Sequence, residues 1–341
     1  MPVQKESKKS LLDRRLDSLK GIKTALILPH DNPDPDAIAA SWGLAYLLKR
    51  DLRITSVIAY GGLIGRAENR AMVKILKIPI VPFHSSMLEK NEIIILIDCQ
   101  PYTGNSSLPQ NVVPDVIIDH HPLRSTTKYK KWAYIKKNTG ATSTIISSFL
   151  QHRNLDIPQS IATALFYAIR SETRELGRMA SRKDYETYLH LFPRVDFDRL
   201  HRITYPPLSP EFYHSVRQAI SQSQVFRHAV VCPLGDVPYP ELAAEMADFL
   251  VLREKIEFSL VMGRYNKALY LSLRSLHPEI NAGELVRTIT EGLGTGGGHG
   301  VMAGGKIEGI PAKKTKEIQS TLTERFLKCL SISRVKAKKL F

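Results

Sequence analysis

Five consecutive apolar residues at positions 93–97 end at Asp98, and no other feature constrains the fold of this chain as strongly. A short apolar run without polar alternation is typical of a strand that is covered on both faces, as in a parallel sheet. We expect strands at 25–28, 54–60, 93–97 and 116–118, and helices at 36–49, 143–152 and 160–169. Strands that alternate with helices predict an α/β fold whose first domain has a doubly wound, mainly parallel sheet.

The second half of the chain has a different pattern. Four prolines between 193 and 210 predict a linker, because proline continues neither a helix nor a central strand. After it we expect a smaller, mixed α/β domain with helices at 211–222, 241–252, 282–291 and within 313–330, and strands at 225–232, 258–262 and 269–273. The predicted organisation is a basic segment at 1–20, a first domain at 21–192, a linker at 193–210, a second domain at 211–330 and a basic tail at 331–341.

The net charge of +15 favours an anionic partner, although basic proteins that bind nothing large are also common. The cysteines, Cys99, Cys232 and Cys329, are too far apart to pair as metal ligands, and such sparse, odd usage is typical of a reducing compartment. The N-terminus lacks the apolar stretch of a signal peptide, and no apolar run is long enough to span a bilayer. The sequence therefore predicts a cytoplasmic protein without a membrane partner.

A cluster of polar residues, HDNPDPD at 30–36, follows the first predicted strand. It places His30, Asp34 and Asp36 in a loop that two prolines stiffen. Carboxylates suit hard divalent ions, and Mn²⁺ also accepts imidazole. Helix capping by Asp34 or Asp36 is the alternative interpretation. Capping explains one aspartate but not His30, so we favour a metal site.

Three further clusters follow predicted strands or a helix. Asp98 ends the run 93–97, Asp119-His120-His121 ends the run 116–118, and Glu172 follows the helix at 160–169. Each has an ordinary explanation alone: a strand-end aspartate, a surface histidine pair and a solvated glutamate. Ligands in open α/β sheets, however, bind beyond the carboxyl ends of the strands, where these residues are expected to meet.

Together the clusters supply the ligands for two divalent ions with one bridging carboxylate. The predicted metal ligands are His30, Asp34, Asp36, Asp98, His120 and Glu172. Two ions at one site lower the pKa of a bound water and clamp both oxygens of a phosphoryl displacement. No cysteine is placed as a ligand, which disfavours structural zinc.

A glycine run at 294–298 is the main feature of the second domain, and His299 follows it. Backbone N–H groups of such a run can hold phosphate, and His299 and Arg274 could add charged hydrogen bonds. The alternative is a flexible turn. The run is not a Walker loop, because no Gly-Lys-Ser/Thr follows it.

At these residues the chain resembles the DHH phosphoesterase family. The sequence HDNPDPDAIAAS at 30–41, the single Asp98 and the triplet at 119–121 resemble three motifs of its catalytic domain. In the second half, GGGHGVMAGG at 296–305 and SLRS at 272–275 resemble the DHH-associated substrate-binding domain. The resemblance spans nearly the whole chain, and the layout is similar to the nano-RNase and pAp-phosphatase group, without room for the extra domains of RecJ exonuclease.

The resemblance implies roles for individual residues. It implies two Mn²⁺ ions per chain, with Mg²⁺ or Co²⁺ as substitutes, and a homodimer. It implies that Asp98, Asp119 and His121 are catalytic, with His121 facing the scissile phosphate. The substrate's terminal phosphate or base would be held by Arg274, Ser275, Gly296, Gly297, Gly298 and His299. Glu172 departs from the family, which usually has aspartate there, so the preferred metal or the activity can differ from that of relatives.

The leading hypothesis is a metal-dependent phosphodiesterase or phosphatase that hydrolyses short oligonucleotides, linear dinucleotides or pAp to mononucleotides. This hypothesis makes the protein an exonuclease or oligoribonuclease that binds nucleotides and nucleic acid. The enzymatic alternative is a hydrolase of pyrophosphate, polyphosphate or cyclic dinucleotides. The alternative from another class is a non-catalytic nucleotide or RNA binder, in which Glu172 marks a weakened metal site.

Overall fold

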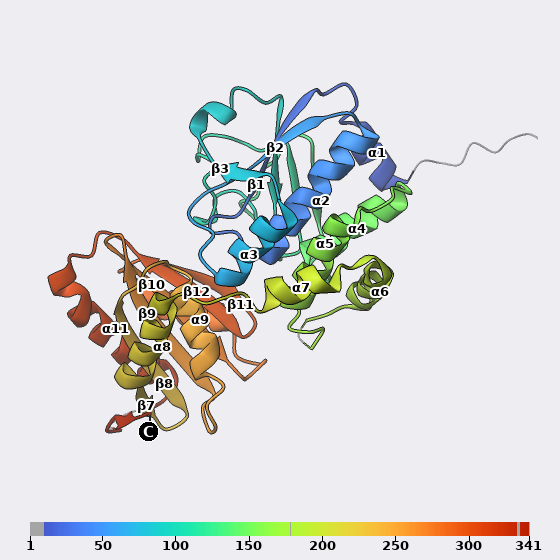
Figure 1. Cartoon of the computed structure of the whole chain (residues 1–341). Coiled ribbons are helices and arrows are strands. Elements are labelled where there is room, and N and C mark those ends of the chain that lie inside the picture. Colours follow the sequence, from blue (N-terminus) through green and yellow to red (C-terminus); the bar gives the residue numbers. More distant parts are fainter. Residues whose placement is uncertain (1–9, 178, 333–334, 341) are drawn as a thin grey trace, which may run out of the picture. The chain divides into compact units, whose positions relative to one another are not determined.

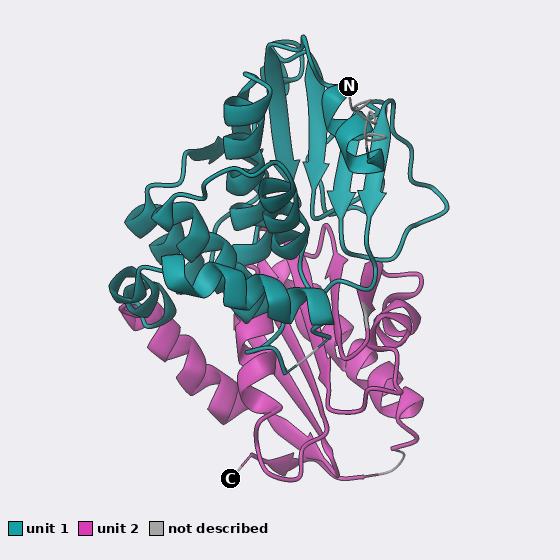
Figure 2. Cartoon of the chain, turned by 90° about the vertical axis from the view of Figure 1, so that its right-hand side faces the viewer, with its two compact units in different colours: residues 1–206 teal, residues 207–341 magenta. Residues whose placement is uncertain are grey.

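The computed structural model describes residues 10–177, 179–332 and 335–340. It divides into two compact units, Met1–Pro206 and Pro207–Phe341 (Figures 1 and 2). The division falls inside the predicted linker at 193–210. None of the helices within these described residues combines the length and hydropathy that crossing a bilayer requires.

The first unit contains a six-stranded sheet and the helices that pack on it. The strands are β1 (Thr24–Pro29), β2 (Thr55–Tyr60), β3 (Ile80–Pro82), β4 (Ile93–Ile97), β5 (Val116–Asp119) and β6 (Trp132–Ile135). The helices are α1 (Leu11–Asp17), α2 (Pro35–Asp51), α3 (Ala67–Leu76), η1 (Ser85–Met87), α4 (Thr142–His152), α5 (Gln159–Glu172), α6 (Arg182–Leu191), η2 (Phe192–Arg194) and α7 (Phe197–Thr204).

The sheet of the first unit is parallel throughout, in the order β3-β2-β1-β4-β5-β6. The predicted α/β fold with a mainly parallel sheet is therefore confirmed. From β1 the chain proceeds outward to β3, and from β4 it proceeds outward to β6 on the other side. A reversal of this kind opens a crevice at the carboxyl ends of the two central strands, and such crevices bind ligands.

The two faces of this sheet are covered differently. On one face Ile27, Ile95 and Ile118 belong to a core built with α2, α4 and α5, which lie together in Figure 1. On the other face Leu28 and Leu96 pack with residues of η1 and the loops near it. Alternate residues of β1 and β4 thus enter two different cores, which explains why their sequences are apolar without alternation.

Several elements of the first unit were not expected from the sequence. The edge strand β3 has only three residues, two of them exposed, and it is shorter than the strands that the sequence indicated. Helix α7 lies within the stretch predicted as a linker, where Leu200 and Ile203 pack in the core of the first unit. The prolines of this stretch flank α7 and do not interrupt it. Helix α1 lies within the predicted basic segment, and its Leu16 is fully buried.

Asp184 of α6 connects three segments of the first unit. Its fully buried carboxylate accepts hydrogen bonds from Gly140 N at 2.7 Å, from Thr144 Oγ1, and from Ser181 N and Oγ at 2.7 and 2.6 Å. We expect Asp184→Ala to lower the free energy of unfolding by about 3 kcal/mol, because several buried donors lose a charged acceptor.

Urea denaturation of the wild type and of the Asp184→Ala variant measures this loss. The matched control is Asp196→Ala, which removes the side-chain cap of α7, a bond to Arg199 N, together with an ion pair to Arg199 Nε at 3.2 Å. We expect the control to cost about 1 kcal/mol. Equal losses in the two variants would contradict the connecting role of Asp184.

The second unit contains a seven-stranded mixed sheet. The strands are β7 (Gln224–Phe226), β8 (Ala229–Asp236), β9 (Phe258–Tyr265), β10 (Ala268–Ser275), β11 (Thr295–His299), β12 (Met302–Ile307) and β13 (Lys338–Lys339). The helices are α8 (Pro210–Gln222), α9 (Leu242–Leu250), α10 (Ala282–Thr290), η3 (Ala312–Lys314) and α11 (Thr315–Cys329). The strand order is β11-β12-β10-β9-β8-β7-β13, with one parallel pair, β8 and β9. The predicted mixed second domain is therefore confirmed.

Two expectations for the second unit need correction. The single strand predicted at 225–232 is a hairpin of β7 and β8, because the chain reverses at Arg227, whose φ is +55°. The glycine run predicted as a loop at 294–298 is mostly strand β11, which pairs with β12 at the edge of the sheet. The strands predicted at 258–262 and 269–273 pair as the hairpin of β9 and β10, with Asn266 and Lys267 as its turn.

Candidate metal centre

The carboxyl ends of β1, β4 and β5 bring the predicted metal ligands of the first unit together. His30 follows β1, Asp98 follows β4, and His120 follows β5. Because β1 and β4 are the central pair at which the strand order reverses, the cluster lies at the crevice that this topology creates. These three predicted ligands therefore lie at one edge of the sheet.

Asp98 is the central residue of the cluster. Its side chain is 3% exposed, and its backbone has a φ of +56°, an uncommon conformation for a residue other than glycine. The amide N of Asp98 donates to Ile118 O at 2.9 Å, and Thr142 Oγ1 donates to Asp98 Oδ1 at 2.7 Å. Burial raises the pKa of Asp98 well above its ordinary value, and the charge of Asp36 raises it further.

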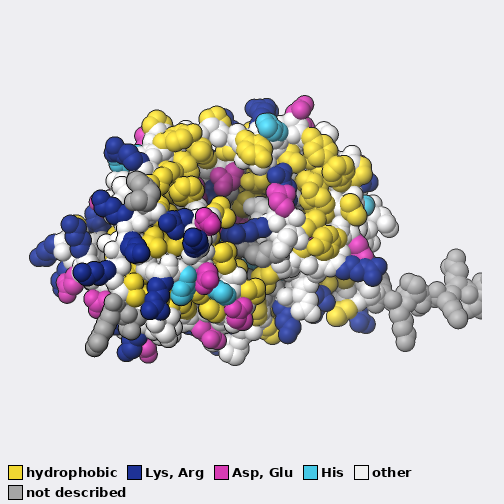
Figure 3. Space-filling view, turned by 90° about the horizontal axis from the view of Figure 1, so that it is seen from below, with side chains coloured by type: hydrophobic (Ala, Val, Ile, Leu, Met, Phe, Trp, Pro, Cys, Tyr) yellow, Lys and Arg dark blue, Asp and Glu magenta, His cyan; other side chains and the backbone are white. Residues whose placement is uncertain are grey.

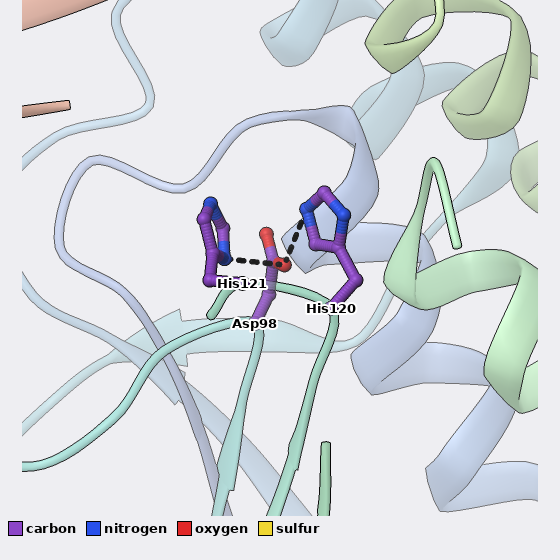
Figure 4. Close-up of side chains that lie close together, drawn as sticks. All are labelled: Asp98, His120 and His121. Carbon is purple, nitrogen blue, oxygen red and sulfur yellow. Dashed lines mark ion pairs between the residues drawn. The ribbon is translucent and has the colours of Figure 1, made fainter. Parts of the chain in front are cut away.

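Two groups of side chains share Asp98. In one group, His120 Nε2 lies 3.5 Å and His121 Nδ1 lies 3.8 Å from Asp98 Oδ1 (Figure 4). In the other, His30 Nε2 lies 3.7 Å from both Asp98 Oδ2 and Asp34 Oδ2. Within each group the candidate ligand atoms all lie within 4.8 Å of one another. The two oxygens of Asp98 thus face different groups, as a bridging carboxylate requires.

The second nitrogen of each of two histidines fixes the direction of its ring. His30 Nδ1 lies 2.9 Å from Asp31 O, and His120 Nδ1 lies 3.1 Å from Thr139 O. Both bonds make Nδ1 the donor, because a carbonyl oxygen only accepts. Nε2 of each ring is then the atom that faces Asp98, and backbone carbonyls commonly orient metal-binding histidines in this way.

Asp34 combines the two roles that the sequence left as alternatives. Its Oδ1 accepts a hydrogen bond from Ala37 N at 3.0 Å and caps α2, while its Oδ2 faces His30. Burial lowers the pKa of His30, but the nearby carboxylate of Asp34 and the charge of Asp98 raise it to about 10. Burial raises the pKa of Asp34, but the nearby imidazole of His30 outweighs burial and lowers it. Capping therefore positions Asp34 without removing it from the cluster.

Asp36 and Glu172 lie close to the cluster without belonging to either group. Asp36 Oδ2 and Oδ1 accept hydrogen bonds from Thr142 N at 2.7 Å and Ser143 N at 2.8 Å, at the N-terminus of α4. Glu172 is the last residue of α5. Burial lowers the pKa of His120, but the charge of Asp98 and, to a smaller extent, the charge of Glu172 raise it above its ordinary value. Both residues remain predicted ligands that are close enough to act electrostatically on the centre.

The loop at 30–36 is held in place by two neighbouring loops. Asp31 N donates to Asn105 O at 2.7 Å, and Ser107 Oγ donates to Asp31 Oδ1 at 2.7 Å. Asn32 N donates to Gly61 O at 2.9 Å. A Cβ at Gly61 would lie 2.0 Å from Asp31 Oδ1, so glycine is required for this approach. The geometry of the cluster therefore depends on segments after β1, β2 and β4.

Gln100 is a residue of the site that the sequence analysis missed. Its Nε2 donates to Asp119 Oδ2 at 2.7 Å, and Asp119 Oδ1 accepts from His121 Nδ1 at 2.8 Å. Its Oε1 accepts from Arg124 N at 3.0 Å and Thr127 Oγ1 at 2.6 Å. This buried amide fixes the Asp119–His121 pair and the loop after it. The only signal in the sequence is its position two residues after Asp98.

We expect Gln100→Ala to lower kcat of the metal-dependent hydrolysis that the sequence predicts by about 10- to 100-fold, which is typical of residues that orient metal-site groups. The reason is that Asp119 Oδ2 loses its donor, so His121 is held less firmly. Steady-state kinetics at saturating Mn²⁺ measures the change. Unchanged kcat would show that Asp119 orients His121 without Gln100.

The donor set of the cluster fits divalent metal ions. Asp98 and His120 are buried, and burying several carboxylates together is costly unless a cation or hydrogen bonds compensate. The imidazole–carboxylate distances of 3.5–3.8 Å are too long for hydrogen bonds, so these groups do not satisfy one another. Carboxylate oxygens with imidazole nitrogens and no thiolate suit Mn²⁺ or Mg²⁺. His30, Asp34, Asp98 and His120 would hold the ions.

The predicted substrate-binding residues lie in the second unit. Arg274 is buried and donates from Nε to Asp248 Oδ1 at 2.7 Å and from Nη1 to Ser272 Oγ at 2.8 Å. Ser275 N, at the end of β10, donates to Val301 O. Gly296, Gly297 and Gly298 are in β11, where α10 packs so closely that a Cβ at Gly283 would lie 2.1 Å from Gly298 O. The backbone of His299 pairs with Met302, and its side chain lies outside the described part of the structure.

Comparisons with known proteins match the two units to two named domains. The N-terminal domain of the DHH family matches residues 24–169, and the DHHA1 domain matches residues 229–328. An exopolyphosphatase-related protein from Bacteroides fragilis has the same fold, with a TM-score of 0.71 at 16% identity, and covers 95% of this chain and 100% of its own. At this identity the likeness shows the fold alone.

Two curated relatives are similar in sequence. An uncharacterized protein of Methanocaldococcus jannaschii is 32% identical over 284 residues, which are 83% of this chain and 57% of that protein. A probable manganese-dependent inorganic pyrophosphatase of Enterococcus faecalis is 28% identical over 148 residues, 43% of this chain and 47% of that protein. The chain thus spans only about half the length of these relatives.

Proposed function

The chain belongs to the DHH family, and from this premise we propose that it is a phosphoesterase that uses two Mn²⁺ ions to release mononucleotides from short oligonucleotides, linear dinucleotides or pAp. The observation that carries the proposal is Asp98, whose two carboxylate oxygens face two different groups of candidate ligands. A pair of ions that shares one carboxylate is typical of two-metal phosphoryl transfer.

The residues of the centre have separate roles in the proposed reaction. Bound divalent ions would supply Lewis-acid chemistry and lower the pKa of a water. His30, Asp34, Asp98 and His120 would hold the ions, with Asp36 and Glu172 as further ligands. Asp119 orients His121 through the 2.8 Å bond to Nδ1. His121, whose side chain is 35% exposed, would face the scissile phosphate and donate a hydrogen bond to it.

Residues of the second unit would hold the distal part of the substrate. The support is the edge position of β11, because its outer side offers backbone N–H groups that no strand of the described sheet pairs with. Arg274, Ser275, Gly296–Gly298 and His299 would bind the terminal phosphate or the base. Arg274 would keep its bond to Asp248, since that bond aims the guanidinium. We further propose a homodimer in the cytoplasm, where the three free cysteines would stay reduced.

The second candidate function is hydrolysis of pyrophosphate or polyphosphate. It is favoured by the similarity to a manganese-dependent pyrophosphatase, which covers 43% of this chain. The DHHA1 match covers the second unit, which contains the glycine-rich strand β11. We propose that this strand binds part of a nucleotide, so we favour nucleotide substrates over pyrophosphate and polyphosphate. Cyclic dinucleotide hydrolysis and non-catalytic nucleotide or RNA binding are the remaining alternatives.

The experiment is a substrate panel with product analysis. Purified protein in Mn²⁺ would receive 5′-labelled pApA, pAp, cyclic di-AMP, pyrophosphate and polyphosphate, each also in excess chelator. The proposal predicts AMP from pApA or pAp and no product in chelator. Phosphate release from pyrophosphate or polyphosphate alone would replace it with the second candidate. Binding of nucleotides without any turnover would favour the non-catalytic alternative.

A further inference from the structure

The positive charge of the chain is distributed unevenly. On the face drawn in Figure 3, Lys and Arg side chains cover more of the surface than Asp and Glu, but acidic side chains lie among them. Between Asp119 and Asp156, in contrast, the sequence contains seven Lys or Arg and no Asp or Glu. This stretch begins at the metal centre, so its charge is placed where a polyanionic substrate would be processed.

Six of these cations form what we call the basic strip. All six are exposed, and none forms an ion pair with another described residue. The basic strip consists of Arg124, Lys128, Lys130, Lys131, Lys136 and Lys137. Unpaired cations at this density repel one another, so a polyanion that binds them gains the release of counterions without breaking any salt bridge.

The backbone places one end of the basic strip at the carboxyl ends of the strands and the other at their amino ends. Near the metal centre, Arg124 N donates to Gln100 Oε1 at 3.0 Å and Lys136 N donates to Asp119 O at 3.0 Å. At the amino ends of the strands, Lys130 N donates to Pro114 O and Lys131 N to Asp115 O, both at 2.8 Å. Four residues of β6 separate these ends, so the basic strip extends roughly 13 Å along the edge of the sheet.

Exposed apolar side chains lie among the cations of the basic strip. Tyr129 is 47% exposed and Leu123 is 64% exposed. The ring of Tyr134 lies 5.0 Å from Lys136 Nζ and 5.4 Å from Arg15 Cζ, so cations already pack against one aromatic face. Aromatic side chains beside cations are typical of surfaces that bind single strands, since every base can stack on an aromatic ring.

We propose that the basic strip binds the backbone of a single-stranded nucleic acid whose end lies in the metal centre. The proposal rests on the proposed function for the reaction at that end, and it adds a binding surface outside the centre. A single strand fits better than a duplex, because stacking on Tyr129 needs unpaired bases. It fits better than polyphosphate, because polyphosphate has no bases that could use the apolar side chains.

The test compares two variants with equal changes of charge. The strip variant carries Lys128→Gln, Lys130→Gln and Lys131→Gln. The control carries Lys49→Gln, Arg50→Gln and Lys74→Gln, which are exposed cations of α2 and α3, on the side of the sheet away from β6. Binding of a fluorescein-labelled 12-mer oligoadenylate is followed by anisotropy in excess chelator, so that no hydrolysis occurs.

We expect the strip variant to bind the 12-mer about 10- to 100-fold more weakly at low salt, and its salt slope to fall by about 2, because each lost phosphate contact contributes about 0.7. The control variant should bind like the wild type. Equal loss in both variants, or competition by polyphosphate as effective as by unlabelled 12-mer, would overturn the proposal. Circular dichroism confirms that both variants are folded.

Hydrolysis of pApA separates this inference from the proposed function. The single internucleotide phosphate of pApA must lie in the metal centre to be cleaved, which leaves at most the 5′-phosphate for the basic strip, so the strip variant should cleave pApA at nearly the wild-type rate. Strip-dependent binding of the 12-mer without cleavage of any substrate would refute the proposed function alone. Cleavage of pApA together with unchanged 12-mer binding by the strip variant would refute the basic strip alone.

Discussion

Asp98→Asn is expected to lower kcat for pApA by about 10³-fold or more, equivalent to roughly 4 kcal/mol of transition-state stabilisation. The reason is that Asp98 is shared by both ligand groups, so one substitution removes a negatively charged ligand from each. The φ of +56° makes asparagine the informative choice, because it tolerates this conformation better than most residues. The substitution thus removes the charge while the backbone is kept.

The matched control for Asp98→Asn is Asp115→Asn. Asp115 is also buried and precedes β5 at the opposite edge of the same sheet, where its Oδ2 accepts from Ile94 N at 2.9 Å. Asparagine retains an acceptor for this bond, and Asp115 lies at the other end of the strands from the metal centre, so we expect kcat within about twofold of the wild type. Asp98→Asn with substantial activity, or equal losses in both variants, would contradict the bridging role.

His121→Asn and His120→Asn are expected to fail in different ways. His121 is held through Nδ1 by Asp119, and its side chain is 35% exposed, whereas His120 is 8% exposed and turns Nε2 toward Asp98. We expect His121→Asn to lower kcat by about 100-fold, as is typical for a group that donates to the reacting phosphate, with Mn²⁺ binding unchanged. His120→Asn should weaken Mn²⁺ binding itself.

The two histidine variants are distinguished by measuring bound Mn²⁺ together with kcat. Isothermal titration calorimetry of chelator-treated protein gives the number of ions and their affinities. Loss of an ion in His121→Asn would make His121 a ligand and contradict its assignment to the substrate. Retention of both ions with normal affinity in His120→Asn would remove His120 from the ligand set.

The sequence predicted the centre of the first sheet well because β4 and β5 are buried on both faces. The apolar runs before Asp98 and Asp119 form the parallel strands β4 and β5. Parallel strands have their carboxyl ends at the same edge of a sheet. This geometry is why His30, Asp98 and His120 could be expected to meet without knowledge of the loops. The edge strands β3 and β6 were missed because they have only three and four residues, and β3 is also mostly exposed.

Parts that depend on tertiary contacts could not be predicted. The glycine run was expected as a loop, but β11 is a strand whose glycines let α10 approach, as at Gly283 and Gly298. The reversal at Arg227 has no glycine, proline or asparagine to indicate a turn. In the site, Gln100 donates a hydrogen bond to Asp119, and Thr142 donates one to Asp98. Gln100 lies in a loop and Thr142 begins a helix, and no local sequence pattern specifies either contact.

The most direct test of the metal-dependent mechanism counts bound ions and measures hydrolysis in the same samples. Chelator-treated wild-type protein would be titrated with Mn²⁺, and each sample assayed for AMP release from pApA. We expect saturation at two ions per chain, with hydrolysis appearing as the second site fills. Hydrolysis at full rate without bound ions, or two bound ions without hydrolysis of any phosphoester in the panel, would contradict it.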